Sequence, residues 1–323
     1  EEGKVALDTP VHRVIPEWRD LGVYAGGFME TFRTTRTKRP MMMVDLLRHT
    51  SGLTYGFQQR TNVDAAYRKL KIGEIEKHGT LDEMVASLAR LPLEFSPGEA
   101  FNYSVSTDIL GYVIGKLSGE PFEAFLKRRL FEPLGMVDTD FHVRAENHAR
   151  CAANYQPRPG GGMALCDDPA KSSYLKPPSL ISGGGGLVST AADYLQFAKM
   201  LLGGGALNGV RYVSPKTLAL MTANHLPGGR SLQDISTSMF SEVSYAGVGF
   251  GLGFSVTTDV AATMIPGSNG DFAWGGAAST YFWVDPKEDL AVIFLTQLLP
   301  SDTYPIRREL RTLVYSAFED ANG

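Results

Sequence analysis

The last third of the chain constrains the fold most, because short strand-like runs follow one another there, with turns predicted at 267–270 and 285–287. The runs are rich in β-branched and aromatic residues and cover residues 249–257, 272–274, 280–284 and 290–296. Connections this short join antiparallel neighbours. An amphipathic helix is predicted from about 305 to 318, with one apolar face made of Ile306, Leu310, Leu313, Val314 and Phe318. We therefore predict an antiparallel sheet closed by a C-terminal helix.

Helical periodicity dominates the middle of the chain. It predicts helices at about 43–48, 62–77, 81–91, 107–117, 121–131, 190–202 and 215–223. Thr80 is the expected N-cap of the third, with Glu83 at the capping-box position. Residues 140–178 have weak periodicity, which favours short strands in a long surface excursion, a lid or a pocket wall. We predict an α+β fold in one domain over 1–323, with a mostly helical lobe at about 40–225 and a C-terminal α/β part at about 245–323.

Composition excludes several classes of function. Charged residues make up 20% of the 323 residues, the formal net charge is −4, and basic runs are short, so we expect no nucleic-acid partner. We expect no membrane span, since no apolar run approaches roughly 18 residues. The six histidines form no H-x-x-x-H pair or Cys/His cluster, and nucleotide-binding motifs are absent, so we predict neither metal nor cofactor. Cys151 and Cys166 could pair or stay free.

A turn that ends in a tyrosine precedes the fourth predicted helix. Pro97-Gly98 is typical of a tight turn, and Tyr103 follows it just before a helix that Ser106 or Thr107 would cap. A phenol at the positive end of a helix dipole has its phenolate form stabilised, which suits a proton shuttle. Taken alone, Tyr103 is better explained as a half-buried aromatic residue that closes the loop.

The first residues are typical of a helix end. Residues 1–10 predict a last helical turn, a glycine stop and an extended exit. We therefore expect the beginning of that helix, and a segment before it, to lie upstream of Glu1.

Five segments occur in the order seen in one enzyme family. They are 46–53 (LLRHTSGL), 97–104 (PGEAFNYS), 133–139 (PLGMVDT), 182–193 (SGGGGLVSTAAD) and 274–277 (WGGA). With these, the chain resembles the serine β-lactamase and penicillin-binding-protein-like hydrolases, and within them the family VIII carboxylesterases. The resemblance covers essentially the whole chain. It implies an antiparallel sheet flanked by terminal helices, with the active site in the cleft between the sheet and the helical lobe.

The resemblance also implies site residues. Such enzymes use the serine of an S-x-x-K motif as nucleophile, and a lysine and a tyrosine take its proton. Tyr103 matches that tyrosine, and the S-x-x-K motif is expected upstream of Glu1. Residues 274–277 stand at the family's K-T-G strand, where Ala277 would offer a backbone N–H to the oxyanion and Trp274, Gly275 and Gly276 would line the substrate site.

Two other patterns compete for catalytic roles. Ser173 and Lys176 form an S-x-x-K pattern, but Pro177 and Pro178 follow at once and forbid a continuing helix. His49 stands at the end of a predicted short helix with a glycine stop, and we interpret it as a packing histidine.

Two departures from the family pattern bear on the substrate. Val105 stands where many β-lactamases have an asparagine that holds the substrate amide, and we place it among the substrate contacts. Trp274 replaces the lysine that binds the carboxylate of penicillins. We therefore predict a serine carboxylesterase for short- to medium-chain esters, a small-molecule substrate class, with weak β-lactam hydrolysis.

Alternatives stay open at this point. The same motifs fit a β-lactamase or D,D-peptidase, and a non-catalytic penicillin-binding-like module is a third hypothesis. Transfer of the acyl group to an alcohol or amine would use the same acyl-enzyme. The absence of a G-x-S-x-G elbow excludes an α/β-hydrolase.

Overall fold

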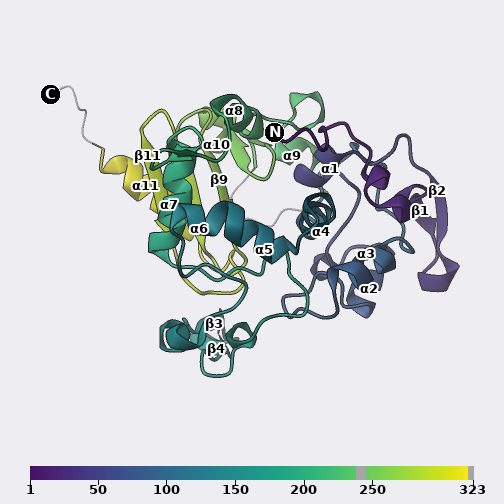
Figure 1. The fold of residues 1–323 in the computed structure, drawn as a ribbon, viewed down its shortest axis with the longest axis horizontal. Helices are drawn as coiled ribbons and strands as arrows, with labels where there is room; N and C mark the ends of the chain where they lie inside the picture. The colour runs from purple at the N-terminus through teal and green to yellow at the C-terminus, as the bar shows by residue number, and fades with distance from the viewer. Residues whose placement is uncertain (238–244, 319–323) are drawn as a thin grey trace. The chain divides into compact units, whose positions relative to one another are not determined.

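Residues 1–237 and 245–318 are described by a computed structural model, coloured from purple to yellow along the chain in Figure 1. Contacts divide the described residues into two units. The first unit contains residues 1–145, 173–189 and 235–237, and the second contains 146–172, 190–234 and 245–318. No helix among the described residues is both long and apolar enough to cross a membrane.

The first unit is mostly helical. It contains the hairpin β1 (Gly22–Gly26) and β2 (Arg33–Arg36), and the helices α1 (Met43–Leu47), α2 (Asn62–Lys69), α3 (Leu81–Leu88), α4 (Ser106–Ser118), α5 (Phe122–Leu126) and α6 (Glu132–Leu134). A π-helical turn, Lys127–Phe131, joins the last two, and 3₁₀ turns lie at Val11–Arg13, Pro16–Trp18, Met29–Thr31, Gly56–Gln58 and Ser173–Leu175.

Capping residues explain where several of these helices begin. Thr80 accepts a hydrogen bond from the Glu83 N–H at 3.2 Å, and the Glu83 carboxylate accepts from the Thr80 N–H at 2.9 Å, which confirms the predicted capping box of α3. Thr61 and Asp64 form the same device at α2. The apolar faces of these helices share one core, which includes Leu46, Val63, Tyr67, Leu88 and Ile109.

The second unit is built around a five-stranded antiparallel sheet in the order β11-β10-β9-β8-β7. Its strands are β7 (Val248–Phe250), β8 (Ser255–Thr257), β9 (Phe272–Gly275), β10 (Tyr281–Asp285) and β11 (Leu290–Phe294). Its other elements are the strand pairs β3 (Asn154–Pro157) with β4 (Met163–Asp167) and β5 (Ala206–Leu207) with β6 (Val210–Arg211), and the helices α7 (Ala191–Leu202), α8 (Pro215–Met221), α10 (Val260–Thr263) and α11 (Ile306–Ser316). Turns Ala145–Arg150 and Pro227–Gly229 and the helix α9 (Leu232–Ile235) complete the described chain.

Strand β10 shows how the sheet is covered. Side chains alternate between the two faces of a strand. Phe282 contacts Tyr194 of α7 edge-on at 5.2 Å, while Trp283 lies under the guanidinium of Arg311 from α11 at 5.3 Å. The sheet is therefore flanked by α7 on one face and α11 on the other; α7 contacts β10 and β11, and Figure 1 shows it near β11.

Three predicted elements differ from the structure. The single strand at 249–257 is a hairpin, because Gly251 and Gly253 bring the chain round and the Gly251 N–H donates to the Phe254 carbonyl at 2.7 Å. Helix α2 ends at Lys69, eight residues before the predicted end at 77. The predicted apolar face of α11 is only partly its packed face: Ile306, Leu310 and Val314 are half-buried, but Leu313 is 67% exposed, and the buried residue of the helix is Arg311.

The contacts also group the chain differently from the predicted lobes. Residues 190–225, placed in the helical lobe from the sequence, belong to the same unit as the C-terminal strands. The reason is α7, whose aromatic residues Tyr194 and Phe197 contact Phe282 of the sheet.

Candidate active site

Loop 97–105 is fixed to the segment that follows α1. The Gly98 N–H donates to the Thr50 carbonyl at 2.8 Å, and the Asn102 N–H donates to the His49 carbonyl at 2.9 Å. The Asn102 side-chain amide donates to the Leu53 carbonyl at 3.0 Å. Gly98 has a φ of +89°, which an L side chain rarely adopts. Motifs 46–53 and 97–104 therefore pack against each other, and Tyr103 lies where they meet.

Tyr103 is half-buried and lies three residues before α4. Its ring centroid lies 4.8 Å from that of His49 and 5.4 Å from that of Tyr55. Its carbonyl accepts a hydrogen bond from the Gln58 side-chain amide at 2.6 Å. The backbone and the ring are therefore held from separate segments, so the phenol has a fixed orientation.

Buried polar side chains form hydrogen bonds with the loop. His49 is 2% exposed, and its Nδ1 accepts a hydrogen bond from the Ser104 N–H at 3.3 Å. Burial lowers the pKa of His49 to about 3, so the ring is neutral at neutral pH. Ser51, Ser104 and Ser106 share hydroxyl contacts of 2.8 Å. These contacts agree with the interpretation of His49 as a packing residue, although the left-handed residue after α1 is His49 itself, with φ +55°, and not a glycine.

Val105 is not where we expected it. Its side chain is fully buried in the core of the first unit, and it is the N-cap residue of α4 in place of Ser106 or Thr107. A Cβ on Gly73 would lie only 2.6 Å from a Val105 methyl group, so core packing surrounds this side chain. A fully buried side chain cannot touch a substrate, and we remove Val105 from the substrate contacts.

Trp274, Gly275 and Gly276 lie at the end of β9, in the second unit. The Trp274 ring meets Phe250 edge-on at 5.2 Å and is partly exposed. Gly275 is paired with Tyr281 of β10 in the ladder. The two glycines have no side chains, and the space beside them is filled by Arg307 and Thr280, so their role as a substrate edge stays a prediction.

Ala277 begins the turn between β9 and β10. The Ser279 N–H donates to the Gly276 carbonyl at 3.1 Å, and the Gly276 N–H donates to the Thr280 carbonyl at 2.9 Å. Ser279 has a φ of +69°, so the turn is a three-residue hairpin loop with a left-handed third residue. In such a turn the first N–H points outward, and the Ala277 N–H meets no hydrogen-bond acceptor among residues 1–237 and 245–318. Ala277 is exposed, so this donor is available to a ligand.

The S-x-x-K pattern at Ser173 lacks the geometry of a nucleophile. Ser173 lies in a single 3₁₀ turn, and both Ser173 and Lys176 are exposed. A serine that serves as a nucleophile needs a base beside it. Within the described chain, Ser173 makes no contact with Lys176 through its hydroxyl. The described residues also contain no group of His, Cys, Asp and Glu side chains that could hold a metal ion, and Cys151 and Cys166 are free thiols.

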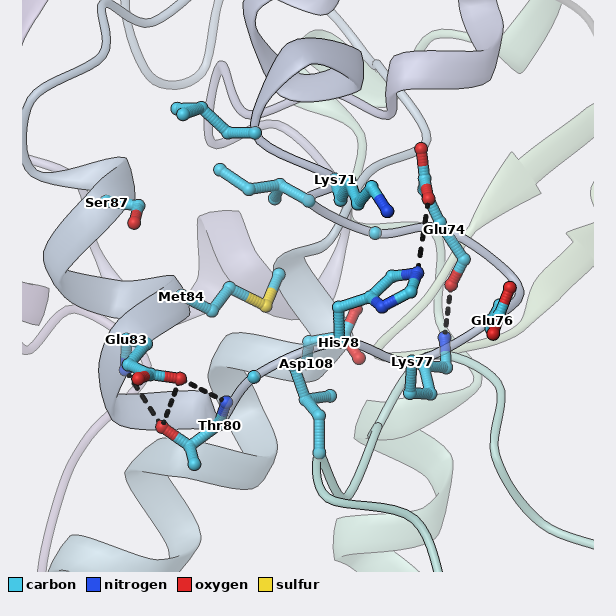
Figure 2. Close-up of a pocket in the computed structure, with 15 residues that line it drawn as sticks. Lys71, Glu74, Glu76, Lys77, His78, Thr80, Glu83, Met84, Ser87 and Asp108 are labelled. Carbon is cyan, nitrogen blue, oxygen red and sulfur yellow. Dashed lines mark hydrogen bonds and ion pairs between the residues drawn. The ribbon is translucent and has the colours of Figure 1, made fainter. Parts of the chain in front are cut away.

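A cavity of about 200 Å³ lies elsewhere in the first unit (Figure 2). It is lined by residues 70–74 and 76–80, by side chains of α3, and by Asp108 and Leu180, and none of the predicted site residues borders it. His78 points toward Glu74, with Nε2 3.7 Å from the carboxylate, and the Lys77 ammonium donates to the Glu74 carbonyl at 2.9 Å. Burial lowers the pKa of Lys77 and raises the pKa of Asp108. The cavity is lined by acidic and basic side chains, but no nucleophilic side chain in its lining is paired with a base.

Three residues beside the predicted site went unnoticed in the sequence. Tyr55 and Gln58 contact Tyr103, and Arg307 of α11 contacts the turn after Gly276. Only Arg307 had a visible signal, because a cation in the first turn of a helix opposes the helix dipole. The other two contacts depend on how loops cross, which periodicity does not report.

Known proteins resemble this chain along nearly its whole length. Residues 1–316 match the Beta-lactamase family. An uncharacterized protein of Mycobacterium tuberculosis is 37% identical over 303 residues, which are 93% of this chain and 73% of that protein.

Two further likenesses are to proteins with a named activity. Esterase EstB of Burkholderia gladioli is 31% identical over 337 residues, covering 97% of this chain and 76% of EstB. The solved structure of EstCE1, titled a hydrolase with promiscuous acyltransferase activity, has a TM-score of 0.74 and 25% identity, covering 97% of this chain and 79% of that one. The α+β fold and the esterase-like branch predicted from the motifs are confirmed.

Proposed function

Because the chain belongs to the beta-lactamase family, we propose that it is a serine carboxylesterase that hydrolyses short- to medium-chain esters through an acyl-enzyme. Its esterase relative and its hydrolase structural neighbour support ester hydrolysis as the general reaction, without specifying the length of the acyl chain. The observation that carries the proposal is the Ala277 N–H, an exposed donor without an acceptor among the described residues, next to a strand end bare of side chains.

The proposed reaction begins with attack on the ester carbonyl by the serine of an S-x-x-K motif other than the one at Ser173. The lysine of that motif and Tyr103 remove the serine proton and deliver it to the leaving alcohol. Negative charge develops on the carbonyl oxygen, and the Ala277 N–H donates to it. Water then attacks the acyl-enzyme by the same proton path in reverse, which releases the acid and restores the serine.

The substrate class follows from Trp274. An indole in place of a lysine removes the cation that would bind a penicillin carboxylate, and it supplies an apolar wall for an acyl or alcohol group instead. We therefore place plain esters ahead of β-lactams. An alcohol that competes with water for the acyl-enzyme would give acyl transfer.

The test is hydrolysis of p-nitrophenyl butyrate by the intact protein and by its Tyr103→Phe variant. Loss of the proton-transfer group should lower kcat by roughly 10²-fold or more. Tyr304→Phe is the matched control, since Tyr304 is 49% exposed and outside the proposed site, and it should keep wild-type kcat. Turnover by Tyr103→Phe within a few-fold of wild type would contradict the role of Tyr103, and nitrocefin turnover equal to ester turnover would favour a β-lactamase.

A further inference from the structure

The turn that presents the Ala277 N–H is held by a side chain from α11. We propose that Arg307 is a positioning residue for ester hydrolysis: it fixes the turn 276–280 so that the Ala277 N–H meets the developing oxyanion. This inference rests on the proposed function and adds a residue outside the motifs that indicated it.

Arg307 bridges the two ends of the turn 276–280. Its Nη2 donates to the Gly276 carbonyl at 2.8 Å and to the Thr280 carbonyl at 3.2 Å. These carbonyls are the two that close the hairpin loop, since they also accept from the Ser279 and Gly276 N–H groups. One guanidinium therefore ties together both ends of the turn, and a charged donor makes these bonds stronger than neutral ones.

The surroundings of Arg307 fix the guanidinium itself. Its Cζ lies 5.5 Å from the centre of the Tyr281 ring, a cation–π distance. A Cβ on Gly275 would lie 2.6 Å from both Cζ and Nη2, so the glycine of the strand end makes the space that the guanidinium occupies. Arg307 is half-buried in this position.

The far side of the turn is fixed independently. The Leu298 N–H donates to the Ala278 carbonyl at 3.0 Å, and the Ser279 hydroxyl donates to the Leu298 carbonyl at 2.7 Å. Removing Arg307 should therefore loosen the Gly276–Ala277 end of the turn while the turn as a whole persists. An oxyanion donor acts only when it is preorganised, so this loosening should lower the rate of chemistry more than substrate binding.

The experiment compares steady-state kinetics on p-nitrophenyl butyrate for the intact wild-type protein, Arg307→Ala, Arg307→Lys and Arg308→Ala. Loss of a whole oxyanion donor lowers kcat by about 10²- to 10³-fold, so a loosened donor in Arg307→Ala should lower kcat by about 10- to 100-fold, with KM within about threefold. Arg307→Lys should be intermediate, because its ammonium ends one bond short of Nη2. Arg308 is the matched control: it is the next residue, is exposed and makes a single long contact with the Met264 carbonyl at 3.5 Å, so Arg308→Ala should stay within twofold of wild type.

A second readout separates positioning from folding. Millimolar guanidinium ion should restore part of the kcat of Arg307→Ala and leave Arg308→Ala unchanged, which a merely structural role would not produce. If Arg307→Ala does not fold, Arg307→Lys decides the question, and a wild-type kcat in that variant would overturn the proposal. A kcat of Arg307→Ala within twofold of wild type would also overturn the proposal. So would a rise in KM as large as the fall in kcat. Wild-type protein without ester hydrolysis would instead overturn the proposed function and, with it, this role.

Discussion

His49 and Tyr103 lie ring against ring, yet their environments give them different roles. His49 is 2% exposed and accepts the Ser104 N–H, so its Nδ1 is occupied by the loop that it supports. Tyr103 is half-buried and lies before the N-terminus of α4. A buried neutral histidine is a stability element, whereas a partly exposed phenol beside a helix N-terminus is suited to proton transfer.

The pKa of His49 gives a stability prediction with a definite sign. Burial lowers that pKa from an ordinary 6.5 to about 3. Between these two pH values His49 is protonated in the unfolded chain but neutral in the folded chain. The stabilisation by neutral His49 is complete above pH 6.5 and is lost as the pH falls toward 3, by up to about 1.4 kcal/mol per pH unit. The difference in free energy of unfolding between wild type and His49→Gln should therefore shrink by about 2–3 kcal/mol between pH 6.5 and pH 4.5 in urea titrations. A difference that stays constant over this range would show that His49 is not buried as a neutral ring.

At the scale of elements, α1 is held at its beginning by one carboxylate. Asp45 is fully buried and accepts hydrogen bonds from Arg39 at 2.6 and 2.8 Å, from the Met42 N–H at 2.9 Å and from Thr50 at 2.9 Å. Arg48 adds a further contact at 3.1 Å. Asp45 therefore joins the beginning of α1 to the segment that contacts the Tyr103 loop.

Replacing this carboxylate should be costly. Asp45→Ala leaves buried donors without an acceptor and should lower the free energy of unfolding by about 3–5 kcal/mol. Asp82→Ala is the matched control, because the Asp82 side chain is 75% exposed in its 3.3 Å ion pair with Lys116; its effect should stay within about 1 kcal/mol. Equal losses in the two variants, measured by chemical denaturation, would contradict the structural role of Asp45.

Local sequence predicted those elements whose ends depend on their own residues. Helix α3 begins at its predicted cap because Thr80 and Glu83 satisfy each other's backbone groups. Helix α4 does not begin at a capping serine, since the Ser106 hydroxyl is occupied by Ser51 and Ser104. Helix α11 is turned so that Arg311 meets Asp271 and Trp283, which no apolar periodicity could reveal.

At the scale of the whole molecule, the candidate site rests on family motifs that lie far apart in the sequence. Tyr103 belongs to the first unit and residues 274–277 to the second, and their catalytic roles stay predictions. Val105 could not be assigned from the sequence, because a family position does not tell whether a side chain points to the cleft or to the core; here it is fully buried. Apart from its place in the first turn of a helix, nothing in the sequence singles out Arg307, because its hydrogen bonds are to two backbone carbonyls.

We propose that the intact protein forms an acyl-enzyme on a serine, and a fluorophosphonate probe tests this most directly. The intact protein should take up one equivalent of the probe, and peptide mass spectrometry should place it on the serine of an S-x-x-K motif other than Ser173. Hydrolysis of p-nitrophenyl butyrate should fall in proportion to labelling. An intact protein that hydrolyses the ester but is never labelled, or one that is labelled on Ser173, would contradict the account.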